Sequence, residues 1–349
     1  MKKRKNCETV CAVIVTYNRK LLLLECLEAL SKQTRPIQGI YLIDNASTDG
    51  TPELLVRKGY IKEGPPENLS KPWEKIFEIK NLTDEQLIKL HYVRMHENTG
   101  GAGGFHEGVK RAYKRGYDWL WLMDDDAEPK DDCLKKLNKY FTKEQVVALT
   151  PAVIGIDNQI DYSHRGSFNF ELFPQLNIPV KEEYYNREFL EIEFSSFVGL
   201  LIKARIIKDI GFPKKEFFIH HDDIEYCIRL NKKGKIFLIP YSTIYHKYHQ
   251  KKFLLKKTFL WKNSLRYPYN VLWMRYYALR NATWISIRES TNKFKIFIRI
   301  FFTLLKEIVR ILIYDDFKFK RSLFLLNAFY DGFIGRFDNI KPKKILYTV

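Results

Sequence analysis

Three consecutive aspartates are the residues of this sequence best suited to chemistry. Asp124, Asp125 and Asp126 directly follow the bulky apolar run 119–123, which is typical of a buried strand. Carboxylates at the carboxyl end of a parallel strand face the crevice where open α/β sheets bind ligands. Adjacent acids repel unless a cation neutralises them, and Mg²⁺ takes carboxylates together with substrate phosphates. Since Asp124 and Asp126 point to the same side of extended backbone, this pair could share one metal ion. A solvated turn that caps a helix from Asp131 is the alternative.

A glycine-rich segment joins a predicted strand at 91–95 to a predicted helix at 105–115, and it comprises Gly100, Gly101, Ala102, Gly103 and Gly104. Such a loop lets the backbone approach a ligand and directs helix N-terminal N–H groups at anions. His106 stands where the last glycine of a GxGxxG motif would be, and the Gly-Lys-Ser/Thr of a P-loop is missing. The segment therefore supports neither an NAD site nor a P-loop, and a plain tight turn is the alternative.

A second acidic cluster, residues 220–225, opens a predicted helix at 222–233. Its acids would stabilise the helix N-terminus electrostatically. In the functional interpretation, a carboxylate of this cluster is a general base for a hydroxyl group. His246 follows a predicted strand at 236–239 and a turn at Pro240. Its imidazole could complete a metal shell, with a structural role as the alternative.

The elements that must position these residues follow an alternating pattern. Short apolar runs at 10–15 and 40–43 predict buried parallel strands, and helices are expected at 21–33 and from Thr51-Pro52 onward. This β-α-β-α order predicts an α/β fold with a doubly wound, mostly parallel sheet flanked by helices. Residues 59–90 break the pattern and are interpreted as an insertion or a helical flap. We expect a further helix at 131–141 and strands at 146–156 and 194–201.

The basic excess of this chain is concentrated near its C-terminus. The net charge is +18, and residues 226–321 hold 22 Lys and Arg but only 4 Asp and Glu. Residues 253–314 are expected to be mostly helical, aromatic and basic, which suits an anionic membrane surface; a helical subdomain or a dimer interface is the alternative. No nucleic-acid recognition motif is present. We therefore expect a domain at 1–250 and a basic helical region at 251–349 for membrane association or homo-oligomer formation.

The cysteine pattern and the apolar runs bear on the compartment. The five cysteines are scattered and form no CxxC pair, which favours neither a disulfide scaffold nor a cysteine zinc site. No apolar run resembles a secretory signal or reaches the roughly 20 residues of a membrane span. The expectation is a cytoplasmic protein, peripheral on the inner face of the cell membrane.

Together these segments resemble the family-two inverting glycosyltransferases, which have the GT-A (Rossmann-like) fold. The resemblance covers about residues 9–250, and the matching segments are AVIVTYNR at 12–19, IDNASTDGT at 43–51, ENTGG at 97–101, MDDD at 123–126 and HDDIEY at 221–226. Within that family, the run NTGGAGGF at 98–105 with the full aspartate triplet is most similar to bacterial galactofuranosyltransferases and their rhamnosyltransferase relatives. The length of 59–90 departs from the family pattern.

The resemblance implies a role for each matching residue. Asp223 would be the catalytic base, with Asp222 as the alternative, and Asp124, Asp126 and His246 would bind Mn²⁺ or Mg²⁺. The nucleotide-sugar site would comprise Thr16, Tyr17, Arg19, Asp44, Asn98, Gly100, Gly101 and Asp125.

The resemblance also implies a substrate class. UDP-galactofuranose is the preferred donor, dTDP-rhamnose is the alternative, and a lipid-linked or cell-surface polysaccharide precursor is the expected acceptor. A single displacement would invert the anomeric centre. A nucleotidyltransferase and a non-enzymatic binder of anionic surfaces are the alternatives from other classes.

Overall fold

The computed structural model describes residues 8–247 and 254–348. The chain divides into two compact units. The first unit comprises residues 1–167, 179–215 and 223–248. The second unit comprises residues 168–178, 216–222 and 249–349.

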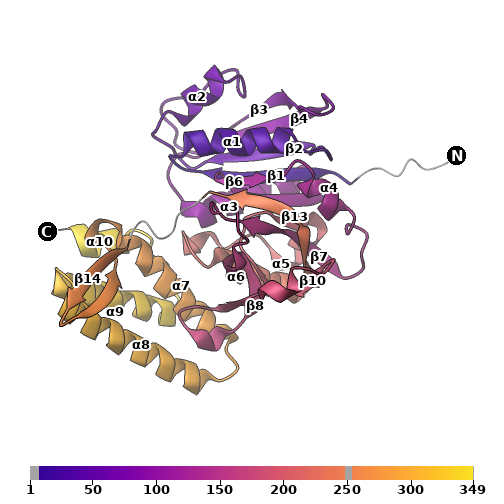
Figure 1. Ribbon diagram of the computed structural model, residues 1–349. Coiled ribbons are helices and arrows are strands. Elements are labelled where there is room, and N and C mark those ends of the chain that lie inside the picture. Colours follow the sequence, from indigo (N-terminus) through magenta and orange to yellow (C-terminus); the bar gives the residue numbers. More distant parts are fainter. Residues whose placement is uncertain (1–7, 248–253, 349) are drawn as a thin grey trace. The chain divides into compact units, whose positions relative to one another are not determined.

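A large mixed sheet forms the first unit (Figure 1). Its strands follow the order β10-β13-β7-β12-β5-β1-β2-β4-β3, and β6 pairs with β13. The strands are β1 (Val10–Thr16), β2 (Gly39–Asp44), β3 (Trp73–Lys80), β4 (Leu87–Arg94), β5 (Trp119–Asp124), β6 (Ala127–Pro129), β7 (Val146–Ile154), β10 (Leu190–Ile192), β12 (Leu200–Lys203) and β13 (Lys235–His246). The neighbours β5, β1, β2 and β4 run parallel. The expected α/β fold with a parallel sheet core is therefore confirmed, and antiparallel strands flank that core.

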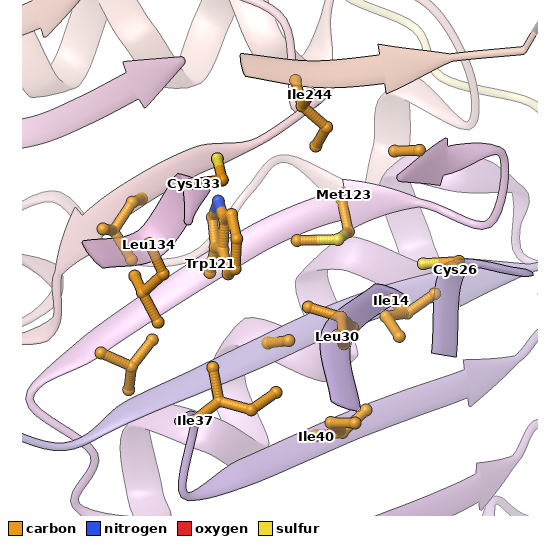
Figure 2. Packing of buried hydrophobic residues seen from close by; sticks show 14 of the residues in the cluster. Ile14, Cys26, Leu30, Ile37, Ile40, Trp121, Met123, Cys133, Leu134 and Ile244 are labelled. Atoms are coloured by element: carbon orange, nitrogen blue, oxygen red, sulfur yellow. The ribbon is translucent and has the colours of Figure 1, made fainter. Parts of the chain in front are cut away.

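Helices cover both faces of this parallel core. The helices of the first unit are α1 (Lys20–Ser31), α2 (Thr51–Arg57), α3 (Gly100–Arg115), α4 (Cys133–Asn138), α5 (Ile207–Ile210) and α6 (Asp222–Asn231), of which α6 takes its first residue from the second unit. Figure 2 shows Leu30 of α1 and Leu134 of α4 packed with Ile14, Trp121 and Met123 of the sheet. Each such fully buried aliphatic side chain contributes about 1.5–3 kcal/mol relative to exposure.

Helix α3 packs on the opposite face of the sheet, which follows from the alternation of side chains along a strand. A Cβ atom on Gly104 would lie 2.5 Å from Val15, and one on Gly108 would lie 2.4 Å from Val13. Neither valine belongs to the cluster that α1 and α4 cover. The two glycines therefore let the helix approach β1 closely.

Residues 59–90 differ from the expected helical flap. Strand β3 pairs antiparallel with β4, which begins at Leu87 rather than at residue 91. Phe77, Ile79, Ile88 and Leu90 are buried at alternate positions, so the two-residue period of a strand decides the conformation. The segment therefore extends the sheet at its edge.

Two further boundaries differ from expectation. Helix α3 begins at Gly100 rather than at residue 105, so the glycine-rich segment is the first turn of the helix. Strand β13 continues through Pro240, where its pairing with β7 shifts register between Ile239 and Thr243. An irregularity of this kind accommodates proline, which has no N–H for the ladder.

The second unit is largely helical, as expected, but it also contains a hairpin. Its elements are β14 (Leu255–Phe259), β15 (Lys262–Arg266), α7 (Trp273–Glu289), α8 (Lys293–Tyr314), α9 (Lys318–Ile334) and α10 (Lys341–Tyr347). Strands β14 and β15 pair antiparallel where helix was expected. Within the described ranges, none of the helices has the length and apolar character needed to cross a lipid bilayer.

Candidate active site

Several predicted site residues lie together at one end of the parallel strands. These are the carboxyl ends of β1, β2, β4 and β5. Thr16 lies opposite Asp44, and Asp44 lies opposite Arg94. On the other side of β1, Val15 lies opposite Asp124. Parallel register therefore aligns the first residue of the aspartate triplet, Asp124, with the end of β2.

Thr16 and Arg19 hold the second and third aspartates. The hydroxyl of Thr16 donates to Asp125 Oδ2 at 2.7 Å. The Arg19 guanidinium donates to Asp125 Oδ1 at 3.2 Å and to Asp126 Oδ2 at 2.8 Å. His246 Nε2 lies 3.4 Å from Asp126 Oδ1. Side chains from two distant segments, residues 16–19 and His246, thus converge on these two carboxylates.

Burial and mutual repulsion distribute the charge of the triplet unevenly. Burial, together with Asp126 and Asp125, raises the pKa of Asp124 to about 7. Burial raises the pKa of Asp125 to about 6 although Arg19 opposes the shift. For Asp126, burial is outweighed by His246 and Arg19, so its pKa is lowered. The raised pKa values show that Arg19 and His246 do not fully offset the cost of ionising three buried, adjacent carboxylates, and a bound cation would lower that cost.

Asp44 is the centre of a buried cluster that sequence reasoning found only in part. Its carboxylate accepts hydrogen bonds from Tyr92 Oη at 2.7 Å, from Arg94 at 2.6 Å and from the Ser47 backbone N–H at 2.9 Å. Tyr92 and Arg94 were not among the predicted site residues. What identifies Tyr92 and Arg94 as partners of Asp44 is the register of β4 against β2, and this register is seen only in the folded sheet.

A cavity of about 450 Å³ lies beside this cluster. It is lined by Ala46, Pro52, Pro65, Arg94 and His96, among others. Its size is within the range of small-molecule sites. Part of segment 59–90 therefore contributes a wall of this cavity.

Asn98 and Gly100 are tied to Asn45, another residue that sequence reasoning left without a role. Asn45 Nδ2 donates to Asn98 Oδ1 at 3.1 Å and to the Gly100 carbonyl at 2.9 Å. Asn98 Oδ1 also accepts from the Gly100 N–H at 2.8 Å. These bonds fix the start of α3 against the end of β2. The position of Asn45 directly after Asp44 is the signal that could have identified it.

The glycines of α3 divide into two groups. Gly104 and Gly108 are needed where the helix packs on β1, as described above. A Cβ atom on Gly101 would meet nothing within 4 Å. Gly100 has φ +72°, a conformation that favours glycine. Gly100 and Gly101 thus remain candidates for ligand contact.

The second acidic cluster begins α6, as expected. Asp222 is buried. The Asp223 carboxylate accepts a hydrogen bond from the Ile224 backbone N–H at 2.7 Å. Burial raises the pKa of Asp223 to about 6. An acid of this pKa is ionised at neutral pH and able to accept a proton.

The remaining predicted residues are less tightly gathered. Tyr17 is 43% exposed at the end of β1. In residues 8–247 and 254–348, no group of three or more His, Cys, Asp and Glu is arranged to hold a metal ion. The structure brings Asp126 and His246 together, and the three-residue metal set that includes Asp124 stays a prediction.

The comparisons with known proteins identify the family and the fold of the chain. The family model described as glycosyl transferase family 2 matches residues 11–65 and 71–211. The chain is 27% identical to galactofuranosyltransferase GlfT1 of Mycolicibacterium smegmatis over 240 residues, which span 68% of each chain. It is 24% identical to dTDP-rhamnosyl transferase RfbF of Shigella flexneri over 202 residues, 56% of this chain and 62% of that one.

Two solved structures share the fold at low sequence identity. GalNAc-T7 with UDP, GalNAc and Mn²⁺ has a TM-score of 0.58 and 15% identity, and the match covers 95% of this chain and 56% of that one. S. aureus TarS 1-349 in complex with UDP has a TM-score of 0.53 and 14% identity, and the match covers 93% and 80%. The chain thus spans little more than half the length of GalNAc-T7, and these likenesses establish the GT-A fold.

Proposed function

Because the chain belongs to glycosyl transferase family 2 and is a glycosyltransferase, we propose that it transfers galactofuranose from UDP-galactofuranose to a hydroxyl of a lipid-linked or cell-surface polysaccharide precursor. The similarity to galactofuranosyltransferase GlfT1 supports this donor. Rhamnose transfer from dTDP-rhamnose is the second candidate, supported by the similarity to RfbF.

The observation that carries the proposal is that two different sites, the Asp44 cluster and the aspartate triplet, lie side by side at the carboxyl ends of the parallel strands. The Asp44 cluster offers fixed hydrogen-bonding groups beside a cavity. The aspartate triplet, on the other side of β1, offers surplus negative charge. A nucleotide diphosphate requires both, since its base and ribose need directed hydrogen bonds and its phosphates need a cation. Thr16, Tyr17 and Arg19 would contribute to the same nucleotide site, together with Asn98, Gly100, Gly101 and Asp125.

A divalent cation fits the donor set at this edge. Asp126 Oδ1 and His246 Nε2 lie 3.4 Å apart, and carboxylate oxygen with imidazole nitrogen suits Mn²⁺ and, through the oxygens, Mg²⁺. We propose that Asp124, Asp126 and His246 hold the ion. When bound, it would stabilise the negative charge that develops on the departing diphosphate.

Asp223 is proposed as the base of an inverting displacement. Its ionised carboxylate takes the proton of the acceptor hydroxyl while that oxygen forms a bond to the anomeric carbon. The bond between the anomeric carbon and the diphosphate oxygen breaks, and the nucleoside diphosphate leaves with that electron pair. One base and one leaving group suffice, so no covalent enzyme intermediate is required. Asp222 is the alternative base.

The second unit is proposed to bind an anionic membrane surface that carries the acceptor. Helix α8 buries Ile296, Ile300, Glu307 and Ile311 but exposes a series of large apolar side chains: Phe294, Phe297, Phe301, Phe302, Leu305 and Leu312. Because aromatic and aliphatic side chains interleaved with lysines suit the lipid interface, we expect peripheral association with the inner face of the cell membrane.

The tip of the β14–β15 hairpin supports the same proposal. Leu260 and Trp261 both have positive φ, at 40° and 62°, a conformation that hairpin turns ordinarily give to Asn and Gly. The Trp261 side chain is 93% exposed. Lys256 and Lys262, on the two strands of the same hairpin, are exposed as well. Several arginines of this unit form internal ion pairs, as Arg266 and Arg275 do with Glu307, whereas these lysines complement anionic headgroups.

A donor panel tests the catalytic proposal. The melting temperature should rise with UDP more than with dTDP, and more with Mn²⁺ present. Transfer from UDP-galactofuranose should release UDP. A preference for dTDP and dTDP-rhamnose would favour the second candidate. Release of pyrophosphate from a nucleoside triphosphate and a sugar phosphate would instead indicate a nucleotidyltransferase.

Vesicle flotation tests the membrane proposal. The full chain should float with phosphatidylglycerol-containing vesicles and less with neutral ones, and Trp261→Ser combined with Phe302→Ser should reduce flotation. Sedimentation velocity is run on the same samples. If the chain forms a stable homo-oligomer through these residues and ignores vesicles, or binds DNA tightly in place of vesicles, the membrane proposal is wrong.

A further inference from the structure

The backbone that leads into α6 is strained over a short segment. Phe218, His220 and His221 have φ of 63°, 68° and 64°. Side chains other than glycine rarely adopt this region, because Cβ crowds the neighbouring carbonyl. Three such residues within four positions persist only where the surrounding structure holds them. They directly precede Asp222 and Asp223.

Asn281 of α7 holds this segment through its amide. Its Nδ2 donates to the carbonyl oxygens of Phe217 at 3.0 Å, Ile219 at 3.2 Å and His220 at 2.9 Å. The Asn281 side chain is fully buried. The two N–H groups of one amide therefore serve three backbone acceptors, one N–H being shared between two carbonyls, in a segment that has no regular hydrogen-bond ladder.

Arg280, the preceding residue, orients that amide and adds two contacts. Its Nε donates to Asn281 Oδ1 at 3.0 Å, which directs Nδ2 toward the carbonyls. Its guanidinium donates to the carbonyls of Glu216 and Phe217, both at 3.1 Å. A buried guanidinium is costly unless hydrogen-bonded, and here it donates to this segment, to Asn281 and to Asn339 Oδ1.

We infer that Arg280 and Asn281 are positioning residues for the transfer reaction: by holding residues 216–221, they set the direction in which α6 begins and thereby orient its acidic side chains. The inference rests on the proposed role of Asp223, or of Asp222, as the base. It assigns to α7, in the basic C-terminal region, a part in catalysis that is separate from membrane binding.

The test is Asn281→Leu in the full chain, which keeps the branched shape of the side chain and removes the donors. We expect kcat for transfer to fall by about 10- to 100-fold, because a small misplacement of a catalytic group has an effect of that order. The KM for the sugar nucleotide and the affinity for UDP should change less than about twofold, since this substitution leaves the donor-binding residues intact. Asn281→Ser, which keeps one donor, should give an intermediate loss and serves if the leucine variant does not fold.

Two further variants separate positioning from a general loss of structure. Thr283→Val is a control on the same helix. The Thr283 hydroxyl is buried without a hydrogen-bond partner in the described residues, so this substitution should not change kcat. Adding His220→Gly to Asn281→Leu should recover much of kcat, because glycine adopts positive φ without the hydrogen bonds from Asn281. The inference is overturned if kcat of Asn281→Leu equals that of the parent, if Thr283→Val loses as much, or if the added glycine recovers nothing. Retained transfer by Asp223→Asn and Asp222→Asn would instead overturn the proposed base.

Discussion

Gly108 offers a direct measure of how closely α3 must approach the sheet. A Cβ atom at this position would lie 2.4 Å from Val13 Cγ1 and 3.1 Å from Ile43 Cγ1. The first distance is about 1 Å short of ordinary contact, and a β-branched valine has few rotamers with which to yield. Gly108→Ala therefore requires the helix or the strand to move.

The size of the effect follows from two opposing contributions. Overpacking a core of this kind costs about 1–3 kcal/mol, while replacing glycine by alanine in a helix gains up to about 1 kcal/mol. Gly101→Ala is the matched control, because its Cβ would meet nothing within 4 Å and it shares the propensity gain. The difference in unfolding free energy between the two variants should therefore be about 1–3 kcal/mol, with Gly108→Ala less stable.

Thermal and urea unfolding of the full chain measure this difference. It corresponds to a difference in Tm of roughly 1–4 °C if a chain of this size unfolds in one step. UDP binding is the second readout: Gly101→Ala should weaken it if that glycine faces the sugar nucleotide as predicted. The packing argument would be refuted if Gly108→Ala were as stable as Gly101→Ala.

Four further outcomes are expected. Asp223→Asn should retain UDP binding, and its rate of transfer should fall by about 10²- to 10⁴-fold. In the parent enzyme, the rate of transfer should fall tenfold per pH unit below about pH 6, because the Asp223 base becomes protonated there. A rate that stays constant down to pH 5 would argue against this base. Tyr92→Phe removes one hydrogen bond to the buried Asp44 carboxylate and should lower the unfolding free energy by about 1.5–3 kcal/mol, and a loss under 0.5 kcal/mol would contradict the cluster's importance. EDTA should abolish transfer, and added Mn²⁺ should restore it in the parent but not in Asp126→Asn. Activity that survives EDTA would contradict the metal proposal.

The local pattern of the sequence was sufficient for much of the first unit. Short apolar runs are stable in the interior of a sheet, so β1, β2 and β5 lie close to where they were expected. The period of two was present in segment 73–94 as well. Three charged residues at exposed positions of β3, Lys75, Glu78 and Lys80, and the Pro-rich sequence before the strand conceal this period in the sequence.

The sequence by itself determined the residue types of the site and that the aspartate triplet ends a strand, because the alternation of chain elements is a local property. Only the tertiary structure decided that Tyr92 and Arg94 meet Asp44, that Arg19 bridges Asp125 and Asp126, and that Asn281 holds the carbonyls before α6. These contacts join residues tens of positions apart in the chain. Strand register and helix packing create them, and neither leaves a trace in the spacing of residues along a single sequence.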